Sequence, residues 1–491
     1  MQNKRCCAGV VAPSWALPLA PFLVLFLALS LICVGSPARA QGNWYTEMNA
    51  DAVPATDIQK IGPYSTFKLE NGLQVVVAPD FRSPVVVHMV VYRAGGVDEP
   101  AGESGIAHML EHMMFKGTPT VPAGEFSKTI QRLGGQDNAF TTADFTAYHQ
   151  KLSRDNLAEA VKMEADRMAN LQINDKTFTP EHQVVLEERN MRIDSQPVNS
   201  FFEAFNAKQY NVLPYRKPVI GWRPEMEAYT VAKANNWYHN FYAPNNAIVV
   251  FAGAITPEEA EWVARTYYGP IPARPIKPLT TIPTEPEHAQ PTRFTQLDPR
   301  VQVPVFVRSY RAPSLHAGVA GAPVPPAKDD YALMILADAL GGGQASRLYQ
   351  TLVVKDKLAD GASASYSPVA RLESTFDIHV SPKVDADMGK VEAAVDGVLD
   401  DVRAHGITEA ELKRAKMNIK SSDLYARDDL FNTAYKLGTW LATGGTLKSY
   451  ADWLPTLEKV TLADVSRMAD RVLQRPRRTT GLLLPEKTQE K

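Results

Sequence analysis

The chain has very little cysteine, and what it has lies close to its start. Only three of the 491 residues are cysteine, at positions 6, 7 and 33. All three fall in a segment typical of a cleaved export signal, with a basic start, an apolar run over about 17–34 and the small-residue site Ala38-Arg39-Ala40. We expect cleavage after Ala40 and export to the periplasm. The mature protein then has no disulfide, and any metal must be held by nitrogen and oxygen.

A membrane span and a basic block are also absent from the expected mature chain. The apolar run at the start is broken by Pro18 and Pro21 and is too short for a spanning helix, so we expect no stable membrane anchor. Residues 1–40 carry three basic and no acidic side chains, and their removal changes the formal net charge from −2 to −5. This balance argues against nucleic acid as a partner.

Proline is abundant and divides the chain. A Pro-rich stretch from Pro270 through Pro286 separates two halves of roughly two hundred residues, and each half has an ordinary domain size. Such a stretch favours extended backbone with few contacts, as a linker requires. The predicted organisation is a signal peptide at 1–40, an N-terminal extension at 41–65, a first domain at 66–269, a linker at 270–295 and a second domain at 296–484.

The two halves repeat one order of elements. Residues 67–77 predict two strands joined by a turn at Asn71-Gly72, and the run 85–92 (VVVHMVVY) predicts a strand buried on both faces. The run 303–310 plays the same part in the second half. Helices are expected at 105–115, 154–171, 180–195, 331–340, 391–404 and 408–426. This order predicts an α+β protein built from a duplicated unit.

The residues with the clearest chemistry are His108-Met109-Leu110-Glu111-His112. In a helix these spacings place both histidines and the glutamate on one face. Two imidazoles on adjacent turns can hold one zinc ion, and a carboxylate beside them can take a proton from water that the metal activates. The pattern arises by chance in about one chain in a hundred of this length, so the motif needs support from its context.

A catalytic zinc ion takes three protein ligands, and without cysteine the third must be histidine or carboxylate. The helix expected at 180–195 begins with Thr179 as its N-cap and Pro180 in the first turn. Glu181 and Glu188 share one face of that helix, whereas Glu187 is rotated about 100° away and is expected to be a solvated charge. His182 and His149 remain alternatives as ligands.

These motifs resemble the insulinase/pitrilysin family of zinc peptidases, the inverzincins, of the bacterial secreted two-domain type. The similarity runs from about Thr66 to Leu484 and is most specific over 93–118 (RAGGVDEPAGESGIAHMLEHMMFKGT). It implies two family-type domains, each a mostly antiparallel sheet flanked by helices, which form half of a clamshell. The first domain would carry one Zn²⁺ and the second none. The implied activity is zinc-dependent endopeptidase cleavage of peptides or small unfolded proteins.

The resemblance also assigns residues. It implies His108, His112 and Glu188 as zinc ligands, Glu111 as the general base, and Glu181 as a carboxylate that supports a ligating histidine. Residues 134–148 resemble the family's edge strand, on which substrate adds as a further strand, and this implies substrate binding by Asn138 and Ala139.

The second half departs from the family pattern. Val353 and Asp360 stand where members that work alone carry an Arg and a Tyr that contact substrate and the developing oxyanion. Arg347, Tyr349 and Tyr366 lie near but out of register. We therefore expect a related subunit without the metal motif to supply the pair in a heterodimer, with a homodimer as the alternative.

Two other functions stay open at this point. The chain could be a non-catalytic zinc-binding assembly or structural subunit of the same fold, which would bind zinc without hydrolysis even beside its partner. It could also be another zinc hydrolase, such as an amidase. The edge-strand pattern favours extended peptides over amidase substrates.

Overall fold

The protein is described here by a computed structural model. It describes Trp44 and residues 58–276, 285–286, 290–315 and 327–486. The predicted signal peptide, most of the predicted N-terminal extension and part of the predicted linker lie outside these residues. None of the helices in the described part of the chain combines the length and apolarity that a membrane span requires.

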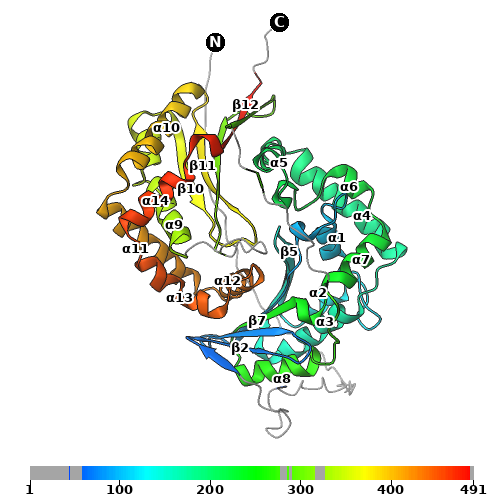
Figure 1. The fold of residues 1–491 in the computed structure, drawn as a ribbon. Coiled ribbons are helices and arrows are strands. Elements are labelled where there is room, and N and C mark those ends of the chain that lie inside the picture. The colour runs from blue at the N-terminus through cyan, green and yellow to red at the C-terminus, as the bar shows by residue number, and fades with distance from the viewer. Residues whose placement is uncertain (1–43, 45–57, 277–284, 287–289, 316–326, 487–491) are drawn as a thin grey trace, which may run out of the picture. The chain divides into compact units, whose positions relative to one another are not determined.

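Two mixed sheets form the framework (Figure 1). The first sheet has the strand order β1-β2-β3-β7-β4-β6-β5, and the second has the order β10-β11-β9-β12-β8. In the first sheet the strands are β1 (Gln59–Ile61), β2 (Tyr64–Lys68), β3 (Gln74–Pro79), β4 (Val85–Tyr92), β5 (Gln136–Thr141), β6 (Thr146–Ser153) and β7 (Ala247–Gly253). In the second they are β8 (Thr292–Asp298), β9 (Val305–Ala312), β10 (Ala359–Tyr366), β11 (Ser374–Pro382) and β12 (Arg478–Pro485).

The duplication predicted from the sequence is visible in the topology. The first sheet contains the run β3-β7-β4-β6-β5. The second sheet, when it is read from the β8 edge, has the order β8-β12-β9-β11-β10, which is the same arrangement of five successive strands. Each run has a single parallel pair, β3 with β7 and β8 with β12, and its other pairs are antiparallel. The α+β class is therefore confirmed. β9 begins at Val305, directly after Pro304, which has no N–H to donate to a sheet.

Helices flank both sheets. In the first half, which we define as residues 58–276, they are α1 (Ile106–Met113), α2 (Glu125–Arg132), α3 (Leu157–Asn170), α4 (Asp175–Arg189), α5 (Pro197–Gln209), α6 (Arg223–Glu227), α7 (Val231–Phe241) and α8 (Pro257–Tyr267). In the second half, residues 290–486, they are α9 (Ala327–Gly341), α10 (Met388–His405), α11 (Glu409–Ala426), α12 (Leu430–Ala442), α13 (Leu447–Glu458) and α14 (Leu462–Val472). Helix α11 has Thr408 as its N-cap, so the helix expected at 408–426 is confirmed.

The start of α4 lies five residues before its predicted first-turn Pro180. α4 begins at Asp175, and its N-cap is Asn174, whose side chain accepts a hydrogen bond from the Thr177 amide at 3.2 Å. The prediction of a start at Thr179 was therefore wrong, and Pro180 lies inside the helix. Pro180 removes one intrahelical hydrogen bond, and the capping box at Asn174 satisfies amides at the start of the helix.

A helix from each half packs against the sheet of the other half. On β4, Val86 and Val90 face the core of the first half, whereas Met89 and Val91 face α12 of the second half. In return, α5 of the first half covers the second sheet, where Phe201 and Phe205 pack with Val307 and Leu483. This exchange explains why the VVVHMVVY strand is apolar on both faces.

Glycine allows close packing where α12 covers the first sheet and where α5 covers the second sheet. A Cβ at Gly438 of α12 would lie 2.9 Å from Val91 Cγ2, and a Cβ at Gly481 of β12 would lie 2.6 Å from Phe205 Cδ2. Neither position has room for a larger side chain unless its neighbour moves.

Candidate metal centre

Helix α1, which carries the His108–His112 motif, begins at a buried position where a glycine and a carboxyl group stabilise its first turn. Gly105 precedes α1 with a φ of 85°, a left-handed conformation that favours glycine. Its amide and that of Ala107 donate to Glu99 Oε1 at 2.9 and 3.2 Å. A carboxyl group at this place accepts hydrogen bonds from N–H groups that would otherwise be free at the start of the helix.

Three side chains converge on one point beside this helix. His112 Nε2 lies 3.1 Å from Glu188 Oε2, and His108 Nε2 lies 3.8 Å from the same oxygen. One ligand atom from each of the three residues falls within 4.8 Å of the others. Tetrahedral zinc ligands at about 2.1 Å from the ion lie roughly 3.4 Å apart, so the arrangement fits a His₂Glu zinc site that leaves one position open.

Among the described residues, a side chain hydrogen-bonds the Nδ1 atom of one of the two histidines. Glu181 Oε1 lies 2.9 Å from His112 Nδ1, and its other oxygen pairs with Lys116. Such a carboxylate sets the tautomer and orientation of a ligating imidazole. Within the described part of the chain, the buried Nδ1 of His108 has no hydrogen-bond partner. The sequence did not identify Lys116 as part of this cluster.

The charges explain how this cluster holds together. Burial lowers the pKa of His112, but hydrogen bonds with Glu181 and Glu188 outweigh it and raise the pKa to about 9. Burial and the neighbouring His112 charge lower the pKa of His108 to about 4. The hydrogen bond with His112 lowers the pKa of Glu188. The positive charge between the two carboxylates therefore lies on His112, and a metal ion would supply positive charge at the same place.

Glu111 lies on the same helix and is held by a strand of the first sheet. Thr141 Oγ1 of β5 donates to Glu111 Oε2 at 2.6 Å. Burial raises the pKa of Glu111, and the hydrogen bond from Thr141 opposes this. The sequence reasoning did not single out Thr141. Its only signal was the position at the end of the expected edge strand, three residues after Asn138.

Glu188 also has a partner on its outer side. Arg192 Nη1 lies 2.7 Å from Glu188 Oε1, one helical turn further along the chain. The oxygen of Glu188 that faces His108 and His112 is the other one, Oε2. Arg192 was not a sequence candidate. It leaves Glu188 with one oxygen bound to a cation of the protein and one oxygen directed at the histidines.

The other ligand alternatives are placed elsewhere. His182 Nε2 lies 2.7 Å from the carbonyl oxygen of Met226, and the His149 ring packs against Phe431 with centroids 4.6 Å apart. Glu187 is exposed, as expected for a solvated charge. Tertiary packing therefore brings Glu188, and none of these three, to the histidines.

Asn138 and Ala139 lie on β5, which ends the first sheet. The strand pairs with β6 on one side, with Asn138 opposite His149 and Ala139 opposite Tyr148. Its other edge has no partner among the described strands. The Ala139 amide donates to the Asn138 side chain at 2.9 Å. The position beside α1 is that of an edge strand next to the metal centre.

The residues of the second half that stood near the expected Arg/Tyr pair are engaged locally. Arg347 forms a two-pronged ion pair with Glu411, both hydrogen bonds at 2.7 Å. The Tyr366 hydroxyl lies 2.6 Å from Asp330 Oδ1. The remaining positions of this region are in three different settings: Tyr349 opens the π-helical segment η7 (Tyr349–Lys355), Val353 packs against the core, and Asp360 is exposed.

Comparison with known proteins shows the family of the chain. The family described as Insulinase (Peptidase family M16) matches residues 75–222, and the Peptidase M16 inactive domain matches residues 228–419. The chain therefore belongs to the M16 peptidase family, has both of its domains, and is a zinc protease.

Individual relatives have the same two-domain span. The zinc protease PqqE of Helicobacter pylori is 28% identical over 425 residues, which cover 86% of this chain and 93% of that protein. An uncharacterized zinc protease of Mycobacterium tuberculosis is also 28% identical, with the same coverage. The crystal structure of a protease from Helicobacter pylori superposes with a TM-score of 0.78 at 28% identity, and covers 86% of this chain and 99% of that one. The insulinase resemblance seen in the sequence is confirmed.

Proposed function

We propose that this zinc protease is an endopeptidase that cleaves peptides or small unfolded proteins, with Glu111 as its general base. The observation that carries the proposal is the convergence of His108, His112 and Glu188 on one point, with Glu111 on the same helix and anchored by Thr141. The raised pKa of Glu111 suits a carboxylate that must both accept and return a proton.

The residues divide the chemistry between them. His108, His112 and Glu188 would hold one Zn²⁺, which supplies a Lewis acid that activates water and polarises the peptide carbonyl. Glu181 holds the His112 ring in the orientation that directs Nε2 at the ion. Glu111 takes the proton of the attacking water and passes it to the leaving amine. The free edge of β5, at Asn138 and Ala139, binds the peptide as an added strand through backbone hydrogen bonds.

The decisive test replaces Glu111 with glutamine. Glu111→Gln keeps the side-chain shape and the Thr141 contact but removes the proton acceptor, so we expect kcat to fall about 10²- to 10⁴-fold with one zinc per chain retained. The matched control is Glu187→Gln, the same substitution at an exposed site, which should leave kcat unchanged. Zinc content and cleavage of a short unfolded peptide are the measurements. Wild-type turnover by Glu111→Gln would reject this mechanism.

We further propose that a related subunit without the metal motif supplies the missing Arg/Tyr pair in a heterodimer; a homodimer is the alternative arrangement. The support is that Val353 and Asp360 cannot donate to an oxyanion as that pair would, and that Arg347 and Tyr366 have partners within the second half. Activity should rise by orders of magnitude when the product of a neighbouring, related reading frame is added. Strong activity of the purified protein alone would contradict the partner.

Export to the periplasm is part of the same proposal. It is supported by the signal-like composition of residues 1–40. N-terminal sequencing of the protein from its native cells should read from Gln41, and a chain that retained Met1 would contradict the export.

A further inference from the structure

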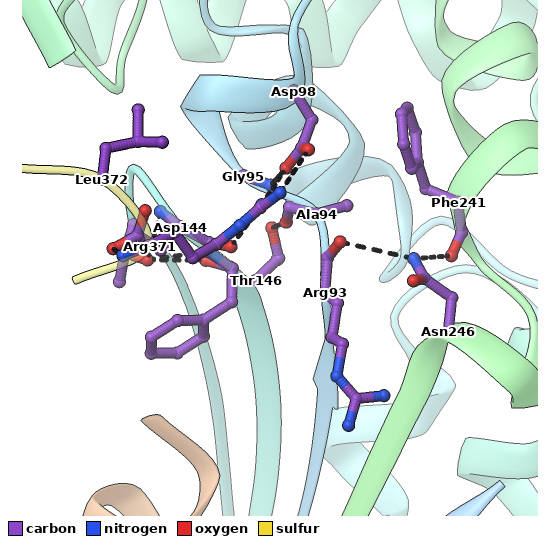
Figure 2. Close-up of polar contacts among 12 residues, drawn as sticks. Arg93, Ala94, Gly95, Asp98, Asp144, Thr146, Phe241, Asn246, Arg371 and Leu372 are labelled. Atoms are coloured by element: carbon purple, nitrogen blue, oxygen red, sulfur yellow. Dashed lines mark hydrogen bonds and ion pairs between the residues drawn. The ribbon is translucent and has the colours of Figure 1, made fainter. Parts of the chain in front are cut away.

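Three segments from distant parts of the sequence meet in a cluster of polar contacts around Arg371 (Figure 2). They are the segment after β4 (residues 93–98), the β5–β6 turn (142–145), and the loop between β10 and β11 (367–373), which comes from the second half. The first two are tightly joined, because the Gly96 and Val97 amides donate to the carbonyls of the turn at 3.1 and 2.8 Å. A Cβ at Gly95 would lie 2.6 Å from the Phe145 nitrogen.

Arg371 joins the second half to both of these segments. Its guanidinium donates to both Asp98 oxygens, at 2.6 and 3.0 Å, and to the Asp144 carbonyl at 3.1 Å. Its backbone amide reaches the Asp144 side chain at 3.3 Å. Tyr215 completes the cluster by donating to Asp144 at 2.6 Å while accepting the amide of Leu372 at 3.1 Å. The Asp98 side chain is 3% exposed, so this is a buried ion pair.

Each of the two clamped segments leads directly to a catalytic feature. Asp98 precedes Glu99, the carboxyl group that accepts the first-turn amides of α1, the helix of His108 and Glu111. Asp144 lies in the turn that closes next to Thr141, which donates to Glu111. The start of the Glu111 helix and the hydrogen-bond donor of Glu111 are therefore tied together through one guanidinium.

We propose that Arg371 is a positioning residue: the second half, which provides none of the three ligands, uses it to hold the start of α1 and Thr141 in the register that Glu111 requires. The inference rests on the proposed role of Glu111. It gives the second half a function in catalysis that does not depend on a contact with substrate.

The chemistry of the cluster requires arginine. A planar guanidinium can meet two carboxylate oxygens and a carbonyl at once, whereas a lysine ammonium offers a point charge without this fork. Burial raises the pKa of Asp98 and of Asp144, and Arg371 opposes both shifts. Without Arg371, Asp98 and Asp144 would lose a nearby positive charge, and the second half would lose its ion pair to the segment after β4 and its hydrogen bond to the Asp144 carbonyl.

The test is a double-mutant cycle on kcat, in zinc-loaded protein and with the partner subunit where activity requires it. Arg371→Met and Thr141→Val should each lower kcat about 10- to 100-fold, as expected for loss of a charge-assisted hydrogen bond in the active site. Because both act through Glu111, the double variant should fall no further than the more damaged single variant. Zinc content should stay at one per chain. Multiplicative losses, or a wild-type kcat for Arg371→Met, would overturn the inference.

Controls separate positioning from stability. Asp428→Asn removes a second ion pair between the halves, Arg82 with Asp428 at 2.9 Å, in which both side chains are more than 60% exposed, and should leave kcat unchanged. Arg371→Lys, which keeps a positive charge, serves if the Met variant does not fold, and should still lose kcat. Guanidinium ion at non-denaturing concentration should partly restore the kcat of an Arg371→Ala variant. A positioning role would be contradicted if Arg371→Lys kept the wild-type kcat and guanidinium ion did not restore the kcat of Arg371→Ala. Wild-type turnover by Glu111→Gln would instead reject the proposed function itself.

Discussion

The support of His112 by Glu181 can be tested through zinc affinity. Glu181→Gln keeps an oxygen acceptor for His112 Nδ1 at 2.9 Å but removes the negative charge, and it leaves Lys116 beside a neutral amide. A hydrogen bond to a charged group contributes about 1.5–3 kcal/mol and a neutral one about 1 kcal/mol. The difference of about 0.5–2 kcal/mol corresponds to a zinc Kd about 2- to 30-fold weaker.

The measurement is a competition titration against a chromophoric zinc chelator at constant pH and ionic strength. Glu181→Ala, which removes the acceptor as well, should weaken binding further, towards about 100-fold. Glu187→Gln is the matched control, because Glu187 lies on the same helix but is exposed, and its Kd should stay within about 2-fold of wild type. If Glu181→Gln bound zinc as tightly as wild type, Glu181 would not orient the ligand, and the argument from the 2.9 Å contact would be refuted.

Two further predictions concern stability. Gly438→Val should lower the free energy of unfolding by about 1–3 kcal/mol, because its Cβ would lie 2.9 Å from Val91. The control is Gly397→Ala on α10, where nothing lies within 4 Å of the added Cβ, and this variant should be neutral or stabilised by up to about 1 kcal/mol. Equal losses of stability for the two variants in chemical denaturation would contradict the close packing of α12 on β4. Burial raises the pKa of Glu411, but hydrogen bonds from Arg347 and at the helix start outweigh it and lower the pKa to about 2. The pair therefore stabilises the fold above the unfolded pKa of about 4.5, and Glu411→Gln should cost roughly 1–2 kcal/mol at pH 7, after allowance for solvent screening. That cost should shrink as the pH falls from 4.5 towards 2; a cost that stayed constant would show that the charge of Glu411 is not its source.

The periodicity of the sequence was sufficient for the framework. Alternation and apolar runs predicted the strands at 85–92 and 303–310, and the repeated order of elements predicted two related sheets, because these patterns depend on local geometry and on burial. The start of α4 was missed because two capping signals compete within six residues. A Pro at the first turn and an Asn before Asp175 are both good starts, and only the packed structure shows which one is used.

The sequence by itself determined that His108, Glu111 and His112 share a helical face, since a 3.6-residue period brings positions three and four apart together. It also determined that Glu181 and Glu188 share a face of a second helix. Which residue of that helix completes the metal centre was decided only by tertiary structure, because the angle and distance between α1 and α4 depend on side chains throughout the core. The contact of Thr141 with Glu111 and the reach of Arg371 to Asp98 join residues 30 and 273 positions apart. No local pattern encodes contacts of that kind, because the first forms only when the first half folds and the second only when the two halves pack.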